Sequence, residues 1–104
     1  MRRLVYLSSA RRDLQSILDY ISRETRSAEI ALGVVGRIRE KCRSLATLPG
    51  TLGRPRPELR EDVRSVVCGS HVIVFRYRND LLEIINIFEG HRDIVAHYHP
   101  DEGS

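Results

Sequence analysis

The sequence predicts an α+β fold in which an antiparallel β-sheet packs against an N-terminal helical hairpin. Two observations favour this class. Apolar residues recur with helical spacing over residues 8–48, and alternating apolar segments separated by turn signals follow after residue 62. A chain of 104 residues supports one domain with one core. The expected order is strand, helix, helix, strand, strand, strand, with residues 94–104 forming a partly flexible tail.

Residues 3–7 are expected to form a short first strand, because Val5 and Leu7 fall on the same side of it. Ser8 and Ser9 follow, and either hydroxyl could cap a helix by accepting a backbone N–H bond. The apolar residues of this helix are spaced i, i+4, i+7, i+8, i+11, which places them on one face. They are Ala10, Leu14, Ile17, Leu18 and Ile21.

A second, longer helix is expected to begin after Ser27, a plausible cap, and to end at Pro49-Gly50. Its apolar residues approach a 3.5-residue repeat, which is typical of two helices packed nearly antiparallel. They are Ala31, Val35, Ile38, Cys42 and Leu45. Gly33 and Gly36 each weaken a helix by about 1 kcal/mol relative to alanine. We therefore expect them to allow the close approach of another backbone.

The C-terminal half reads as a loop over residues 51–62 and then an antiparallel meander of three strands. The strands are expected at residues 63–68, 71–78 and 82–88, because Gly69-Ser70 and Asn79-Asp80 are turn signals between them. In the middle strand both faces are apolar: Val72 and Val74 alternate with Ile73, Phe75 and Tyr77. Such a strand is either covered on both sides or keeps one face for a partner.

The composition limits the function classes. No apolar run approaches the roughly 20 residues of a membrane span, and residues 4–7 are too short for a signal-peptide core, so we expect a cytoplasmic protein. Cys42 and Cys68 lack metal-ligand spacing and are expected to be free thiols. Lys41 is the only lysine among 17 basic residues. An arginine-rich surface suits an acidic protein partner or a target that handles nucleic acid, although a GC-rich coding bias explains the ratio equally well.

The most specific stretch is a basic loop, Gly53-Arg54-Pro55-Arg56-Pro57-Glu58-Leu59-Arg60, followed by strands that carry Arg64, Arg76 and Arg78 and by Gly90-His91-Arg92. This order resembles the C-terminal half of ParE-like toxins of the RelE/ParE superfamily, which occur in bacterial toxin–antitoxin pairs. The resemblance implies a sheet under a helical hairpin, in agreement with the periodicity. It also implies a protein that is no enzyme, inhibits DNA gyrase by binding, and is neutralised by an antitoxin.

The resemblance implies partners but no cofactor, metal or direct DNA contact. We expect a heteromer with a ParD-like antitoxin, 2:2 or larger, in which an antitoxin segment lies in an apolar groove with basic edges. The groove is assigned to Leu14, Leu18, Val34 and Ile38, and the edges to Arg64, Arg76 and Arg78. Contacts with the target are assigned to Arg64, His91 and Arg92.

Two alternatives stay open at this point. A RelE-like, ribosome-dependent endoribonuclease on the same fold would use Arg64, Arg92 and Tyr98 as its catalytic groups, because RNA cleavage needs a base, an acid and cations for the phosphorane charge. Against it, residues 49–104 contain no lysine, whereas such RNases carry several. The other alternative is a degenerate toxin that binds an antitoxin and harms nothing.

Overall fold

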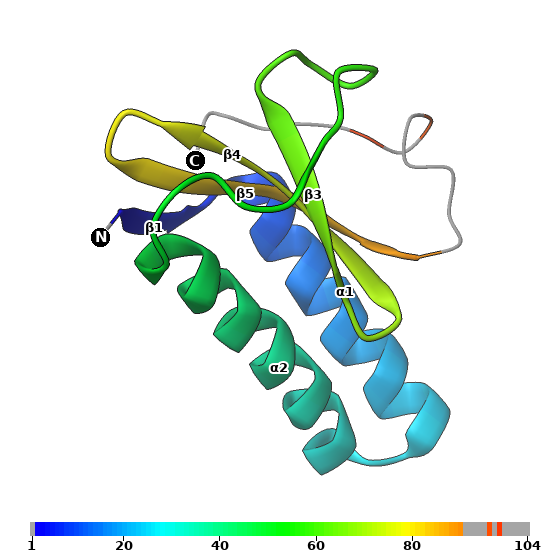
Figure 1. Cartoon of the computed structure of the whole chain (residues 1–104). Coiled ribbons are helices and arrows are strands. Elements are labelled where there is room, and N and C mark those ends of the chain that lie inside the picture. Colours follow the sequence, from blue (N-terminus) through cyan, green and yellow to red (C-terminus); the bar gives the residue numbers. More distant parts are fainter. Residues whose placement is uncertain (1, 91–95, 97, 99–104) are drawn as a thin grey trace.

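The computed structural model describes residues 2–90, 96 and 98, and its elements follow the expected order (Figure 1). They are β1 (Arg3–Tyr6), α1 (Ser8–Thr25), α2 (Ala28–Thr47), β2 (Arg54–Pro55), β3 (Val63–Cys68), β4 (His71–Arg78) and β5 (Leu81–Glu89). The predicted helices and strands are therefore all present. The sequence pattern missed only β2, a two-residue strand inside the loop over residues 51–62.

The five strands form one sheet in the order β1-β5-β4-β3-β2. The meander of β3, β4 and β5 is antiparallel, as predicted. β1, however, pairs parallel to β5, so the sheet is mixed and not antiparallel throughout. A parallel pair needs a long crossover connection, and the helical hairpin lies within that connection. Figure 1 shows both helices on the same side of the sheet.

Apolar side chains pack on both faces of the sheet. The helix-side core lies between the sheet and the helices and includes Ala10, Leu14, Val35, Ile38, Ile73 and Phe75. On the opposite face, the outer-face cluster consists of Leu7, Val63, Val72, Val74, Ile85 and Phe88. β4 thus sends alternate residues to different clusters, as its alternation predicted, and it is covered on both sides.

Polar contacts attach α1 to β5 in two places. The Ser9 hydroxyl donates to the carbonyl oxygen of Ile85 at 2.6 Å. The Asp13 carboxylate accepts hydrogen bonds from the side-chain amide of Asn86 and the backbone N–H of Ile87, each at 2.9 Å. Both contacts lie beside the register shift that occurs where β4 pairs with β5. They fix where the first helix sits over the sheet.

The two predicted helix caps have different outcomes. Ser27 caps α2, and its hydroxyl accepts a hydrogen bond from the backbone N–H of Ile30 at 3.1 Å, as predicted. The prediction that Ser8 or Ser9 caps α1 is wrong, because the capping residue is Leu7 and no side-chain bond is made there. Ser9 is fully buried inside the helix and is used instead for its contact with β5.

The glycines of α2 face solvent. Within the described chain, a Cβ atom built on Gly36 would meet nothing within 4 Å, and one on Gly33 would meet only Nη1 of Arg37, at 3.8 Å. The expectation that these glycines admit another backbone of this chain is therefore wrong. Their cost to helix stability is not offset by packing among the described residues.

Candidate partner-binding surface

The predicted apolar groove is only partly open. Leu14 and Ile38 are 3% and 1% exposed and belong to the helix-side core. The prediction that their side chains line an open groove is wrong, because the apolar face of each helix packs against the sheet. Leu18 and Val34 are half-buried and pack at the margin of the same core.

Arg76 is not a surface residue. Its side chain is fully buried, and its Nε donates to Oε1 of Glu83 at 2.6 Å. The two residues are register partners on β4 and β5. A buried charge must be matched by an opposite charge. The role of Arg76 is therefore structural, as the partner of Glu83 on the neighbouring strand. The prediction that it reaches out to a partner's carboxylates is wrong.

Arg78, two residues further along β4, does lie at the surface. Its side chain is 47% exposed, and its Nη1 is 3.8 Å from the same Oε1 of Glu83. That separation leaves the guanidinium largely solvated. Of the two arginines on this strand, only Arg78 is accessible, and its assignment to a partner stays a prediction.

Arg64 fastens the loop that precedes β3. Its Nε donates to the carbonyl oxygen of Leu52 at 2.7 Å, and its Nη2 donates to that of Gly53 at 2.9 Å. The backbone N–H of Leu52 also donates to the hydroxyl of Tyr77, at 3.2 Å. Arg64 is half-buried, and two of its donor groups are committed to these contacts. Its main observed role is structural.

The basic loop motif is largely a structural device. Gly53 has φ +82°, and a Cβ there would lie 2.7 Å from Cζ of Phe75 and 2.8 Å from the carbonyl oxygen of Ser65. The Nε of Arg56 donates to the hydroxyl of Ser65 at 2.9 Å. Leu59 then packs against the outer-face cluster. The loop is thus held against β3 by contacts that need these particular residues.

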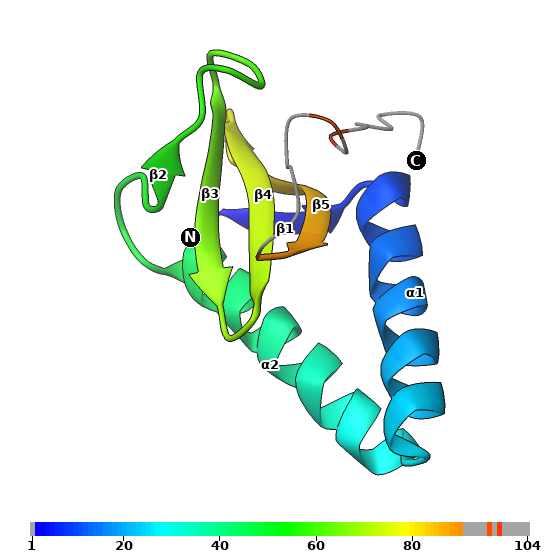
Figure 2. The same ribbon diagram turned by 90° about the vertical axis from the view of Figure 1, so that its right-hand side faces the viewer.

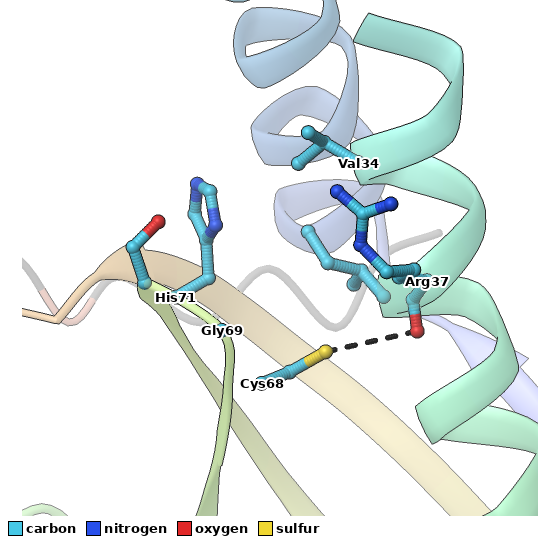
Figure 3. Close-up of a pocket in the computed structure, with 7 residues that line it drawn as sticks. Val34, Arg37, Cys68, Gly69 and His71 are labelled. Carbon is cyan, nitrogen blue, oxygen red and sulfur yellow. Dashed lines mark hydrogen bonds between the residues drawn. The ribbon is translucent and has the colours of Figure 1, made fainter. Parts of the chain in front are cut away.

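A small pocket of about 130 Å³ lies between α2 and the turn of the β3–β4 hairpin. Its lining consists of Val34, Arg37, Ile38, Cys68, Gly69, Ser70 and His71. The thiol of Cys68 lies 3.7 Å from the carbonyl oxygen of Arg37 and joins the strand end to the helix (Figure 3). Figure 2 shows the turn of the hairpin approaching α2. The sequence reading named Val34 and Ile38 here but missed Arg37 and His71.

His71 gives this pocket a titratable group. The residue is 7% exposed, and burial lowers the pKa of its imidazole, while the charge of Glu89 acts in the opposite direction. Glu89 is the register partner of His71 on β5. The low exposure favours a neutral imidazole near neutral pH. The fixed positive charge of the pocket therefore comes from Arg37.

Of the three residues assigned to RNA cleavage, the structure describes Arg64 and Tyr98, and these two lie on opposite faces of the sheet. Arg64 is the register partner of Phe75, so its side chain starts on the helix side of the sheet. Tyr98 is half-buried and packs against the outer-face cluster, on the opposite side. His91 and Arg92 lie outside the described residues, and their assignment to the target stays a prediction.

The described residues contain no group of three His, Cys, Asp or Glu side chains that could hold a metal ion. Nor does any helix among them combine the length and the apolar character that crossing a membrane requires.

Comparison with known proteins agrees with this geometry. The family described as the ParE toxin of the type II toxin–antitoxin system parDE matches residues 4–94. No curated protein matches the chain. Among solved structures, a chain of the chromosomal ParDE toxin–antitoxin system from P. aeruginosa is similar with a TM-score of 0.74 and 26% sequence identity. The similarity covers 86% of this chain and 96% of that one. With its order of strands and helices and a match over most of its length, the chain belongs to the ParE toxin family.

Proposed function

We propose that this protein inhibits DNA gyrase by binding to it, and that a cognate ParD-like antitoxin neutralises it by covering part of its surface. The observation that carries the proposal is the family match over residues 4–94. The similar solved chain comes from a system in which toxin and antitoxin are paired. On this proposal the protein is not an enzyme, and its partners are an antitoxin and a topoisomerase.

The positions of the arginines support binding over catalysis. An RNase would need cations around the scissile phosphate, together with a base and an acid in fixed positions. Arg76 is enclosed in its pair with Glu83, and Arg64 is engaged by two loop carbonyl groups. Tyr98 packs on the opposite side of the sheet from Arg64. This arrangement gives the endoribonuclease alternative no support.

The antitoxin contact is assigned to the surfaces that stay accessible. Leu18 and Val34 offer partly exposed apolar area beside the helix-side core, and Arg78 offers a solvated guanidinium at the end of β4. We infer that the free toxin is not the resting state and that the complex is 2:2 or larger. Contact with gyrase is assigned to Arg64, His91 and Arg92, and Arg64 also holds the loop over residues 51–53 in place.

The test compares two targets in parallel. Purified protein is incubated with gyrase, ATP and supercoiled plasmid, and after protease treatment the DNA is scored for linear product. In a second arm the same protein is added to a translating extract, and the messenger RNA is examined for cleavage. Linear DNA with intact messenger supports the proposal. Cleaved messenger without linear DNA would contradict it and favour the RNase.

A further inference from the structure

We propose that the turn end of the β3–β4 hairpin is a docking site for an extended, acidic segment of the antitoxin. The segment adds a strand beside Val67 and places a carboxylate in the pocket next to Arg37. The identity of the partner rests on the proposed function. The location and the chemistry of the contact rest on the open edge of β3 and on the charge of the pocket.

The edge of β3 is open at its C-terminal end. β2 pairs only with Arg64 and Ser65, and the carbonyl oxygen of Val63 accepts from the backbone N–H of Arg56 at 2.8 Å. In an edge strand, the backbone N–H and C=O groups of every second residue point away from the sheet. Val63 and Ser65 point theirs toward β2, so those of Val67 are expected to point to the same, outer edge. In the described part of the chain, no strand covers β3 at Val67.

The geometry of the hairpin turn independently indicates that the backbone groups of Val67 point away from β4. Cys68 pairs with His71 across the two-residue turn Gly69-Ser70, which makes them the hydrogen-bonded pair next to the turn. Val67 is therefore in a non-hydrogen-bonded position with respect to β4, and its N–H and C=O point away from the sheet. Its side chain is 67% exposed, the largest value among the exposed large apolar residues of the described chain. An uncovered edge of this kind is a template for another strand.

A strand added at this edge would reach the pocket. Side chains of a strand alternate between the two faces of a sheet, so every second side chain of the added segment points toward the helix side. There the pocket opens between α2 and the hairpin turn. Its walls are Val34 and Ile38, and its polar groups include Arg37, Ser70 and His71.

The charge of the pocket selects an acidic side chain. Among the described residues, no carboxylate lines it and Arg37 makes no ion pair, although the charge of Glu89 acts on His71 from β5. The guanidinium of Arg37 runs back along the helix, and its Nη1 lies 3.8 Å from where a Cβ on Gly33 would stand. Figure 3 shows the side chains of Val34 and Arg37 on α2 and the imidazole of His71 across from them on the hairpin. A carboxylate with a short apolar stem matches this combination, and charge-assisted bonds to arginine are strong.

The binding test uses charge-matched variants and the purified cognate antitoxin. Its dissociation constant is measured by calorimetry for the wild type, Arg37→Glu and Arg43→Glu. Arg43 is exposed on the same helix and pairs with Glu40, so its variant has the same net charge but leaves the pocket intact. We expect Arg37→Glu to weaken binding at least about tenfold, and Arg43→Glu by less than about threefold. Equal losses for both variants would overturn the assignment of the pocket.

The strand-addition part is tested by Val67→Pro and by amide exchange. Proline removes an N–H that has no partner in the described chain, so the β3–β4 ladder is kept while about tenfold in affinity is lost. In the wild type, exchange of the Val67 amide should slow in the complex, and an unchanged rate would overturn strand addition. If the dissociation constant is unchanged in both Arg37→Glu and Val67→Pro, this inference alone is contradicted. If the wild type does not bind the antitoxin, the proposed function is contradicted as well.

Discussion

The guanidinium of Arg76 and the carboxylate of Glu83 face each other between neighbouring strands, with 2.6 Å between Nε and Oε1. The Arg76 side chain is fully buried, and the Glu83 side chain is 10% exposed. Removal of Glu83 leaves the buried guanidinium without this carboxylate, and removal of Arg76 leaves Glu83 only the more distant Arg78, at 3.8 Å. A pair of this kind therefore shows its importance mainly when it is broken.

Arg76→Ala is predicted to reduce the free energy of unfolding by about 3–5 kcal/mol, the usual range for breaking a buried pair. Replacement of both partners, in Arg76→Met with Glu83→Leu, should cost much less, because no charge is then stranded. Urea denaturation of the two variants provides the comparison. A loss below about 1 kcal/mol for Arg76→Ala would show that solvent reaches the site.

Gly53→Ala is predicted to destabilise the protein by about 3 kcal/mol, which combines backbone strain with a steric clash. The clash arises because the added Cβ would meet Phe75 and the Ser65 carbonyl oxygen at less than 3 Å. The matched control is Gly50→Ala. Gly50 has nearly the same φ, +80°, but open space around it, so only the strain of about 1–2 kcal/mol applies. Equal losses in thermal denaturation would show that the loop relaxes.

Arg64→Ala is predicted to keep the fold but loosen the loop over residues 51–53, at a cost of about 1–2 kcal/mol. The cause is the loss of the two bonds to the carbonyl oxygens of Leu52 and Gly53. Amide exchange in the loop should speed up, whereas Arg54→Ala, at an exposed position, should leave it unchanged. Reduced toxicity of Arg64→Ala with an unaltered loop would instead assign Arg64 a direct contact with the target.

His71 should make stability depend on pH. Because burial lowers its pKa in the folded state below the ordinary value of 6.5, the unfolded chain takes up the proton first. The contribution to stability is complete above about pH 6.5 and decreases as the pH falls toward the folded-state pKa. Denaturation at pH 7.5, 6.5 and 5.5 should therefore show a steeper loss for the wild type than for His71→Gln. Identical slopes would remove His71 as the cause.

Gly36→Ala is predicted to stabilise the protein by up to about 1 kcal/mol, since alanine is the better helix former and nothing lies within 4 Å of the new methyl group. A rise in the melting temperature would confirm that this glycine has no packing role in the free protein. A fall would reveal a contact made outside the described residues. Weaker antitoxin binding by a more stable variant would place the glycine in the interface.

The secondary structure was largely predictable because periodicity is a local property. The bounds of β3 and β4 follow from turn signals on either side, and Ser27 marks the start of α2. β2 was missed because its two residues, Arg54 and Pro55, pair only through the tertiary position of the loop. The parallel pairing of β1 with β5 joins segments from the two ends of the described chain, which no local pattern reports.

The candidate site was predicted less well, because exposure is decided by what covers a residue. Helical spacing shows that Leu14 and Ile38 share a face with their neighbours, but not that the sheet buries that face. Arg76 looked like a surface residue because its partner, Glu83, is identified only by the register of β4 against β5. Arg37 and His71 come together through packing of α2 on the hairpin turn, and no sequence signal joins them.

The measurement that tests the central claim most directly is a gyrase cleavage assay with antitoxin titrated into it. Supercoiled plasmid, gyrase, ATP and this protein should give linear DNA after protease treatment. The product should disappear as the cognate antitoxin approaches stoichiometric amounts. Absence of linear DNA, in a reaction where an established gyrase poison produces it, would contradict the claim that this member of the ParE toxin family acts on gyrase.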